Sequence, residues 1–331
     1  MKKALYFEKL KENKVQCKLC PQMCIISEGE RGICFGRRNL NGELFAENYG
    51  RTISISLDPI EKKPLYHFYP GKEILSIGPN GCNLRCKFCQ NYHISQQLSQ
   101  TEKITPEELL KYCLQTKSVG VAYTYTEPFI WYEFIFDSAK LLQKNGKKVV
   151  LVTNGMINEE PLRKILPLID AMNIDLKAFS DSFYKKYCSG HFMTVKNTIK
   201  ICASQTHLEI TNLIIPELND SQKDIQNLVD FIASIDDEIP LHFSRYFPVY
   251  KLQKSPTPEK TLLQAYEIAK RKLKYVYVGN IRLSNTSDTF CPNCGELLIS
   301  RGRFSAKVTK IDRDNRCKSC NHKLKGVNLF V

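Results

Sequence analysis

Short runs of apolar residues recur in the middle of the chain, and longer stretches with apolar positions at helical spacing separate them. The apolar runs are Ile74–Ile77, Val119–Tyr125, Val149–Val152, Met172–Leu176, Leu208–Ile215 and Leu241–Phe247. Continuous apolar runs of this length predict buried strands. Strands that alternate with helices predict parallel βαβ units, which form either an open doubly wound sheet or a full or partial barrel. The pattern therefore predicts an α/β fold.

Polar residues mark the expected starts of several helices. Thr105 and Glu108 have the spacing of a capping box, and Pro106 lies at the first helical position. We expect similar helix starts at Ser221–Asp224 and at Thr257–Glu259. These signals support the alternation of helices with strands.

The two ends of the chain have a different pattern. The first region is rich in loop-forming Gly and Pro and suggests short strands, and the last region carries cysteines and many basic residues. We therefore expect a Cys-rich N-terminal region over residues 1–69, a core over residues 70–284 and an appended module over residues 285–331.

Composition and charge narrow the class of protein. The 331 residues are 43% hydrophobic and 25% charged, which is typical of a soluble globular protein. No apolar run approaches the ~18 residues of a membrane helix. The N-terminus is basic, and Glu8 and Lys9 interrupt the apolar stretch that follows, so we expect no signal peptide, no membrane partner and a cytoplasmic location. The net charge of +14 is compatible with an RNA, acidic-protein or phosphorylated substrate, and equally with solvated basic surfaces.

Eleven of the 14 cysteines fall into three tight groups. Cysteines grouped in this way in a reducing compartment indicate metal sites rather than disulfides. The other three, Cys113, Cys188 and Cys202, stand alone, and we expect them to be small core residues or inert thiols.

The central group lies in Gly78–Cys89, directly after the first predicted strand, and has the pattern C-x3-C-x2-C. Its members are Cys82, Cys86 and Cys89. Three thiolates can hold three irons of a [4Fe–4S] cluster, and the absence of a fourth cysteine from the loop leaves one iron open to a ligand. A zinc loop and redox-active thiols are the alternatives.

This loop, with Phe88 just before its last cysteine, resembles the defining motif of the radical S-adenosylmethionine (SAM) superfamily. The resemblance implies that SAM chelates the open iron. It also implies that the reduced cluster cleaves SAM to methionine and a 5′-deoxyadenosyl radical. The protein then supplies position and redox tuning, while the cofactor supplies the chemistry.

Within this resemblance, the ends of the other strands are candidate SAM contacts, because barrel enzymes gather functional residues there. Glu127 offers a carboxylate to the SAM amino group, although Tyr-Thr-Glu stands where many relatives have Gly-Gly-Glu, and it can instead be a helix-start residue. Thr153 and Asn154 can reach the ribose hydroxyls or simply form a turn. Asp175 and Lys177 share one strand face, where they contact SAM or form a structural ion pair.

Beyond the cluster and the SAM site, the sequence gives only weak catalytic candidates. His242 and Arg245 lie in the sixth predicted strand, and either can line the site or be a satisfied core residue.

Several motifs together resemble one branch of the superfamily. Thr153–Gly155, Asp175–Lys177 and Ile215–Asp220 are similar to the pyruvate formate-lyase activating enzymes. A closer similarity, to AmmeMemoRadiSam-system radical SAM proteins, rests on Cys17–Pro21, Asp58–His67, Cys82–Asn91, Tyr123–Pro128 and Cys291–Gly295. The resemblance implies a partial, TIM-like (β/α)6 barrel and a reductant protein such as flavodoxin or ferredoxin. It leaves the substrate open, with hydrogen abstraction from a glycine of a partner enzyme as one option.

The last group has the spacing of two zinc knuckles, with 22 residues between the pairs: Cys291, Cys294, Cys317 and Cys320. Four thiolates suit tetrahedral zinc, ahead of a rubredoxin-like iron. We therefore expect a zinc-ribbon-like module. Its basic residues are compatible with binding of RNA or a protein or, more simply, with a solvated structural ribbon.

The first group has the pattern C-x2-C-x3-C-x9-C and comprises Cys17, Cys20, Cys24 and Cys34. It can hold zinc, which we favour, or an auxiliary iron–sulfur cluster, or it can consist of free structural thiols.

Three functions are compatible with these features. The first is a radical enzyme that acts on a protein glycine, the second is a radical enzyme that modifies RNA or a small molecule, and the third is a non-enzymatic zinc-ribbon scaffold. Detection of 5′-deoxyadenosine separates the third from the other two.

Overall fold

The computed structural model describes residues 1–302 and 304–330. An eight-stranded sheet forms its centre, in the order β16-β15-β14-β13-β12-β11-β9-β8. These strands are β8 (Ser54–Pro59), β9 (Glu73–Gly78), β11 (Gly120–Tyr123), β12 (Lys148–Thr153), β13 (Ala171–Asp175), β14 (His207–Ile214), β15 (Leu241–Arg245) and β16 (Val276–Gly279).

All six predicted strands are confirmed, and they run parallel to one another. Two further strands were not predicted. β16 adds a seventh parallel strand beside β15, and β8 pairs antiparallel with β9 at the opposite edge. Among the described residues β16 and β8 do not pair with each other, so the sheet does not close into a full barrel.

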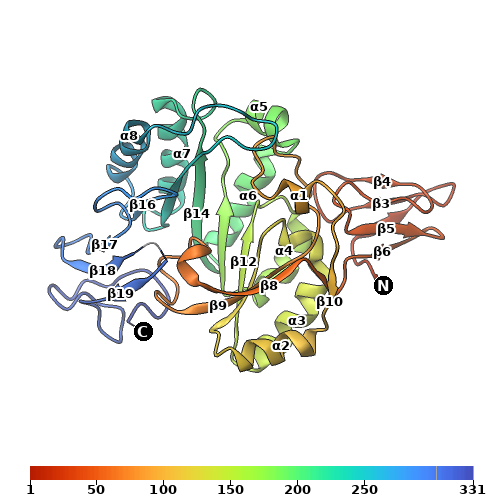
Figure 1. Ribbon diagram of the computed structural model, residues 1–331, viewed down its shortest axis with the longest axis horizontal. Coiled ribbons are helices and arrows are strands. Elements are labelled where there is room, and N and C mark those ends of the chain that lie inside the picture. Colours follow the sequence, from red (N-terminus) through yellow and green to blue (C-terminus); the bar gives the residue numbers. More distant parts are fainter. Residues whose placement is uncertain (303, 331) are drawn as a thin grey trace.

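Helices connect the parallel strands and pack around the sheet (Figure 1). They are α1 (Tyr92–Ser95), α2 (Pro106–Gln115), α3 (Tyr132–Lys144), α4 (Glu159–Ile165), α5 (Asp181–Phe183), α6 (Phe192–Ala203), α7 (Gln222–Ile235) and α8 (Glu259–Lys270). Short helical turns are η1 (Ile60–Lys62), η2 (Pro128–Trp131), η3 (Leu166–Leu168) and η4 (Tyr184–Cys188). The faces of the longer helices that turn inward join the apolar strands in one large core.

All three expected helix starts are confirmed. Thr105 caps α2 in a complete capping box with Glu108, and the Ser221 hydroxyl accepts from the Asp224 amide at the start of α7. The third helix, α8, begins at Glu259 as expected, but its N-cap is Pro258 and not Thr257. The Thr257 hydroxyl instead donates to the Ile214 carbonyl at 2.6 Å, which ties the start of α8 to β14.

Small sheets lie at the two ends of the molecule (Figure 1). The N-terminal strands are β1 (Lys2–Lys3), β2 (Phe7–Lys9), β3 (Val15–Cys17), β4 (Ile25–Ile26), β5 (Arg37–Leu40) and β6 (Glu43–Ala46), and β7 (Arg51–Thr52) pairs with β10 (Glu102–Lys103). The C-terminal sheet consists of β17 (Thr289–Phe290), β18 (Leu297–Arg301) and β19 (Ala306–Val308).

The C-terminal region docks onto the segment that precedes β9. The Val327 amide donates to the His67 carbonyl, the Tyr69 amide donates to the Val327 carbonyl, and Phe68 and Val327 form a parallel β-bridge. The buried His67 ring lies 2.8 Å from the Lys325 carbonyl and 2.6 Å from the Tyr277 hydroxyl. Burial lowers the pKa of His67 to about 4. The neutral ring therefore links this segment, β16 and the C-terminal region.

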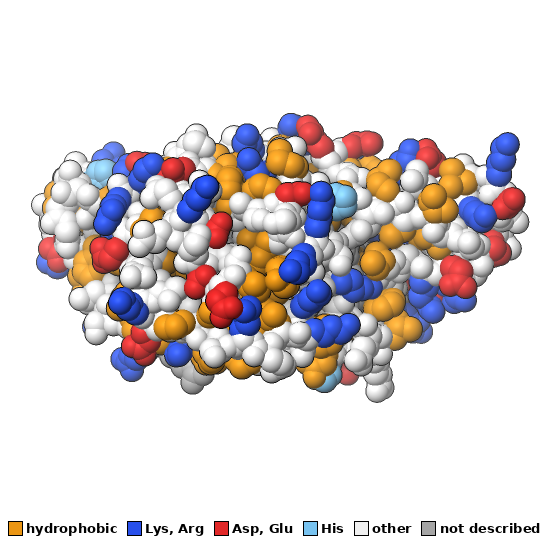
Figure 2. Space-filling view, turned by 90° about the horizontal axis from the view of Figure 1, so that it is seen from above, with side chains coloured by type: hydrophobic (Ala, Val, Ile, Leu, Met, Phe, Trp, Pro, Cys, Tyr) orange, Lys and Arg blue, Asp and Glu red, His pale blue; other side chains and the backbone are white. Residues whose placement is uncertain are grey.

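Charged side chains of both signs are spread over the surface. On the face shown in Figure 2, Lys and Arg side chains are interspersed with Asp and Glu side chains along the molecule. No helix within the described residues is long and apolar enough to cross a membrane.

Candidate metal and cofactor sites

A cavity of about 220 Å³ opens at the carboxyl ends of the parallel strands. The cysteine loop that follows β9 forms one wall. The rest of the wall carries polar residues from the carboxyl-terminal halves of β11 to β16 or just beyond them, together with the apolar Val152 and Leu213: Thr124, Thr153, Asn154, Asp175, Lys177, Thr211, Ser244 and Asn280. The cavity thus has a thiol-rich wall and a largely polar one, as a site for a polar cofactor beside a metal cluster requires.

The three central cysteines all line this cavity, with Cys82 and Cys86 buried and Cys89 half-buried. Their sulfurs do not all lie within 4.8 Å of one another. Each sulfur of a single tetrahedral zinc ion lies about 3.8 Å from the others, given Zn–S bonds of about 2.3 Å. The wider spacing fits a multi-iron cluster better than one ion.

Neighbouring groups fix the loop. The Cys82 sulfur accepts from the Leu84 amide at 3.3 Å and from Asn154 Nδ2 at 3.6 Å, and Cys89 Sγ lies 3.1 Å from Ser95 Oγ. Burial raises the pKa of the Cys82 and Cys89 thiols, so the protein without metal holds them as thiols. Phe88 is buried and also lines the cavity, packed 5.8 Å from the Phe183 ring between centroids.

Glu127 lies behind the cavity wall rather than in it. Its fully buried carboxylate accepts from the Thr153 hydroxyl at 2.6 Å, the Asn154 amide at 2.8 Å and the Phe129 amide at 2.9 Å. Burial raises its pKa to about 7. The structure thus gives Glu127 the helix-start role at η2, and the carboxylate also positions Thr153 and Asn154 at the cavity.

Asp175 and Lys177 both line the cavity, and their charged groups lie 3.0 Å apart. The ion pair weighed from the sequence is therefore present. The Asp175 side chain remains 38% exposed, which leaves its second oxygen accessible to a bound molecule.

The two weak catalytic candidates lie outside the cavity wall. His242 Nε2 is 2.6 Å from Glu209 Oε2, and that buried carboxylate also accepts from the amides of Tyr66 and His67. Arg245 Nε donates to the Thr257 carbonyl at 2.9 Å. Both side chains hold neighbouring segments in place.

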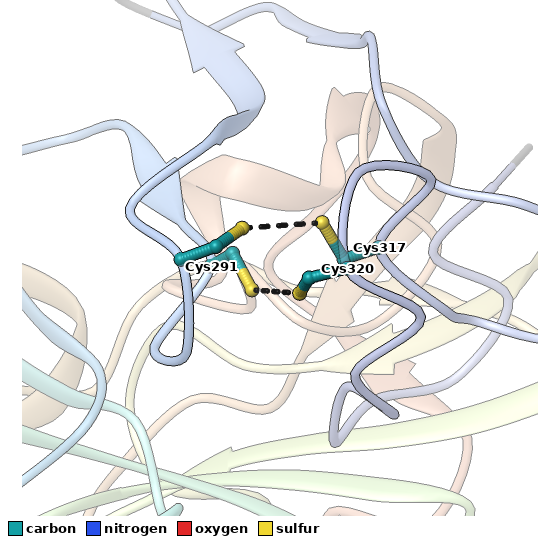
Figure 3. A group of neighbouring side chains, drawn as sticks. Cys291, Cys317 and Cys320 are labelled. Carbon is teal, nitrogen blue, oxygen red and sulfur yellow. Dashed lines mark hydrogen bonds between the residues drawn. The ribbon is translucent and has the colours of Figure 1, made fainter.

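The C-terminal cysteines have a different geometry (Figure 3). All four sulfurs lie within 4.8 Å of one another, with 3.6 Å between Cys291 and Cys320 and 3.7 Å between Cys294 and Cys317. These separations match the edges of a thiolate tetrahedron around one zinc ion, about 3.8 Å. This cysteine cluster fits a single metal ion.

The N-terminal cysteines line a second, smaller pocket together with the buried Arg37 and with Asn83 of the central loop. The Gln22 side chain donates to the Asn83 carbonyl at 2.8 Å, so the region around these cysteines contacts the central loop directly.

Sequence reasoning missed two residues beside the central loop. Cys188, which we expected to be inert, is buried in η4 and hydrogen-bonds to the Cys86 thiol. Asn83 Oδ1 accepts from Asn154 Nδ2 at 2.9 Å. Asn83 could have been identified because it directly follows Cys82. No sequence pattern indicates that Cys188 lies beside the loop.

Comparison with known proteins identifies the class. A family model described as the radical SAM superfamily matches residues 76–232, which include the three cysteines and the strands β11 to β14. The chain belongs to the radical SAM superfamily, whose members use a [4Fe–4S] cluster and SAM.

Individual relatives differ in how much of the chain they match. The uncharacterized protein MJ0808 of Methanocaldococcus jannaschii is 46% identical over 98% of this chain and 99% of its own length. The pyruvate formate-lyase-activating enzyme of Clostridium pasteurianum is 28% identical over 47% of this chain and 67% of its own length. Among solved structures, SAM-bound SuiB of Streptococcus suis covers 67% of this chain and 53% of its own at a TM-score of 0.51 and 15% identity, a likeness of fold alone.

Proposed function

We propose that the chain is a radical SAM enzyme with one [4Fe–4S] cluster on Cys82, Cys86 and Cys89, and with SAM bound in the cavity beside it. The observation that carries this proposal is the position of three widely spaced buried or half-buried thiols on the wall of a cavity at the strand ends. When bound and reduced, the cluster supplies the electron that cleaves SAM to methionine and a 5′-deoxyadenosyl radical.

The chain's own residues bind and orient SAM in this proposal. The Thr153 hydroxyl and Asn154 side chain face the ribose, held in place by Glu127. The Asp175 carboxylate and the Lys177 ammonium offer one charge of each sign to the zwitterionic methionine part. Phe88 closes the apolar side of the loop and limits access of water to the thiols.

The proposed reaction is hydrogen abstraction from a substrate, and a glycine of a partner enzyme is the first candidate. The similarity to a pyruvate formate-lyase-activating enzyme supports this choice. RNA and small molecules are the alternatives. A protein such as flavodoxin or ferredoxin would provide the electron.

The sheet supports a partial (β/α)6 barrel with an added parallel strand, and the four C-terminal cysteines support zinc in a ribbon-like module. The proposed domain boundaries are those expected from the sequence: an N-terminal region over residues 1–69, a core over residues 70–284 and a C-terminal module over residues 285–331. The grouping of eleven of the 14 cysteines in candidate metal sites supports the cytoplasm as location.

The test is anaerobic reconstitution with iron and sulfide, reduction with dithionite and detection of 5′-deoxyadenosine from added SAM. Production of 5′-deoxyadenosine supports the enzyme, and its absence from a fully loaded sample favours a scaffold. Deuterated candidate substrates then identify the hydrogen donor, because the label transfers to 5′-deoxyadenosine.

A further inference from the structure

We propose that Cys17, Cys20, Cys24 and Cys34 hold a second iron–sulfur cluster, and that this N-terminal site is not a zinc site. This inference goes beyond the proposed SAM chemistry and reverses the preference for zinc drawn from the spacing of these cysteines. The four residues lie at the end of β3, in the following turn, just before β4 and before β5, and they line one pocket.

Sulfur spacing carries the choice of metal. No three of these four sulfurs lie within 4.8 Å of one another, whereas all four C-terminal sulfurs do. A tetrahedral zinc ion requires every pair of sulfurs to be about 3.8 Å apart. A cubane cluster binds each thiolate to a different iron, so its ligands stand farther apart. The N-terminal group shares its wide spacing with the central group, not with the C-terminal group.

A buried arginine beside the cysteines has hydrogen-bond donors without a partner among the described residues. Arg37 is only 2% exposed, lines the pocket and donates through Nη1 to Glu133 at 2.7 Å. In the part of the chain that the structure describes, its Nε and Nη2 atoms have no hydrogen-bond partner. Buried unpaired donors are costly and rare. Thiolate and sulfide sulfurs of a cluster in this pocket would accept these hydrogen bonds.

The pocket adjoins the proposed catalytic loop. Gly81 has a φ of +99°, and a Cβ at this position would collide with the Cys34 carbonyl oxygen. The Arg85 side chain donates to the Ile33 carbonyl, and Asn83 lines the N-terminal pocket directly after Cys82. A cluster with four protein thiolates has no open iron. The N-terminal cluster would therefore carry an electron towards the neighbouring loop and would not bind SAM.

Metal analysis of two variants tests the proposal. The triple variant Cys82→Ala, Cys86→Ala, Cys89→Ala leaves the N-terminal site intact, and the double variant Cys20→Ala, Cys24→Ala leaves the central loop intact. After anaerobic reconstitution we expect about eight irons and eight sulfides per chain in the natural protein and about four of each in either variant. All three proteins should keep about one zinc. Cys113→Ala, a lone buried cysteine on α2, is the matched control with the full content.

A folded triple variant with two zinc ions and no sulfide would overturn the proposal, as would one with no metal beyond the C-terminal zinc. If the triple variant does not fold, the double variant decides, because retention of the full iron content would overturn the proposal and loss of half would support it. The double variant also separates this inference from the proposed function. Its remaining cluster should still change its electron paramagnetic resonance spectrum when SAM is added, whatever the N-terminal site holds.

Arg37→Lys provides a second readout. Lysine keeps the positive charge beside Glu133 but lacks the two donors that face the pocket. Because hydrogen bonds to sulfur raise the potential of a cluster, we expect a more negative midpoint potential in the triple-variant background. Arg38→Lys, whose side chain pairs with Glu47 at 3.4 Å, is the control. An unchanged potential in Arg37→Lys would contradict a cluster beside the guanidinium.

Discussion

The central and the C-terminal cysteine groups use the same side chain in opposite ways. The central thiols line a cavity, are largely buried in the main core and stand apart. The C-terminal sulfurs lie within 4.8 Å of one another, Cys294 is exposed, and a small separate core surrounds the group. The C-terminal group fits one ion that stabilises a fold, whereas the central group fits a cluster with one corner free for chemistry.

The distances between sulfur atoms in the folded chain therefore distinguish a single-ion site from a cluster site. The number of residues between the cysteines does not. C-x2-C occurs in all three groups, yet only the C-terminal group brings its four sulfurs to the separation of a single ion. The N-terminal group resembles the central group in this respect.

The strongest test of the comparison is Cys86→Ala. We expect SAM cleavage to fall to background, because one iron of the cluster loses its ligand, while the zinc content stays at about one per chain. The measurements are 5′-deoxyadenosine formed and zinc bound, with Cys113→Ala as the control. Continued cleavage by Cys86→Ala would show that the cluster is assigned to the wrong residues.

The reverse test is Cys317→Ala. We expect loss of the zinc and local unfolding of residues 285–331, because structural zinc contributes about 10–16 kcal/mol in small zinc-binding peptides. Limited proteolysis and metal analysis measure both effects. Ser319→Ala, in the same turn and bonded to Glu296, should keep the metal. Full resistance to protease without zinc would make the metal dispensable for this fold.

A smaller effect is expected from pH at the docking of the C-terminal region. The folded pKa of His67, about 4, lies below its unfolded value of 6.5, so folding releases a proton and stability falls as the pH falls from 6.5 towards 4. Between about pH 7 and pH 5 we expect a loss of about 2 kcal/mol in the free energy of unfolding.

His67→Gln should flatten this dependence in urea titrations at the two pH values. His93→Gln, at an exposed histidine, should not. An equal slope in the natural protein and in His67→Gln would assign the pH dependence to other groups.

The smallest expected effect is at Glu127, which acts on the cavity from behind. In Glu127→Gln an amide replaces one oxygen that accepts from Thr153, Asn154 or Phe129. We expect the dissociation constant of SAM to rise about tenfold, or about 1.4 kcal/mol, at unchanged cluster content. Calorimetry measures the affinity, with the exposed Glu159→Gln as control. Unchanged affinity would remove Glu127 from any role in SAM binding.

Much of the fold could be predicted because the parallel strands that carry it are buried on both faces and read as apolar runs. β8 could not be predicted in this way, because Ser54–Pro59 is an edge strand. Half of its residues are polar, and most of them are partly or fully exposed. β16 was missed since Val276–Gly279 is short and comes soon after the basic segment Lys270–Lys274 at the end of α8. Edge strands pack against fewer neighbours, so their sequences carry a weaker pattern.

The candidate site was less predictable than the fold. Local spacing identified the three cysteines and the strand ends that line the cavity. It could not show that Glu127 turns its carboxylate towards Thr153 and away from the cavity, or that Cys188 meets Cys86. Both depend on contacts between segments far apart in the chain, which no local pattern records.

The bridge between Phe68 and Val327 has a consequence for synthesis of the protein. His67 and Lys325, 258 positions apart, join in the same contact, so the chain must emerge from the ribosome beyond Val327 before this junction forms. In a nascent chain that has completed only the parallel strands, the backbone of residues 67–69 is still exposed to solvent. Premature termination after the last parallel strand would therefore leave an enzyme core with an open seam, a substrate for quality-control proteases.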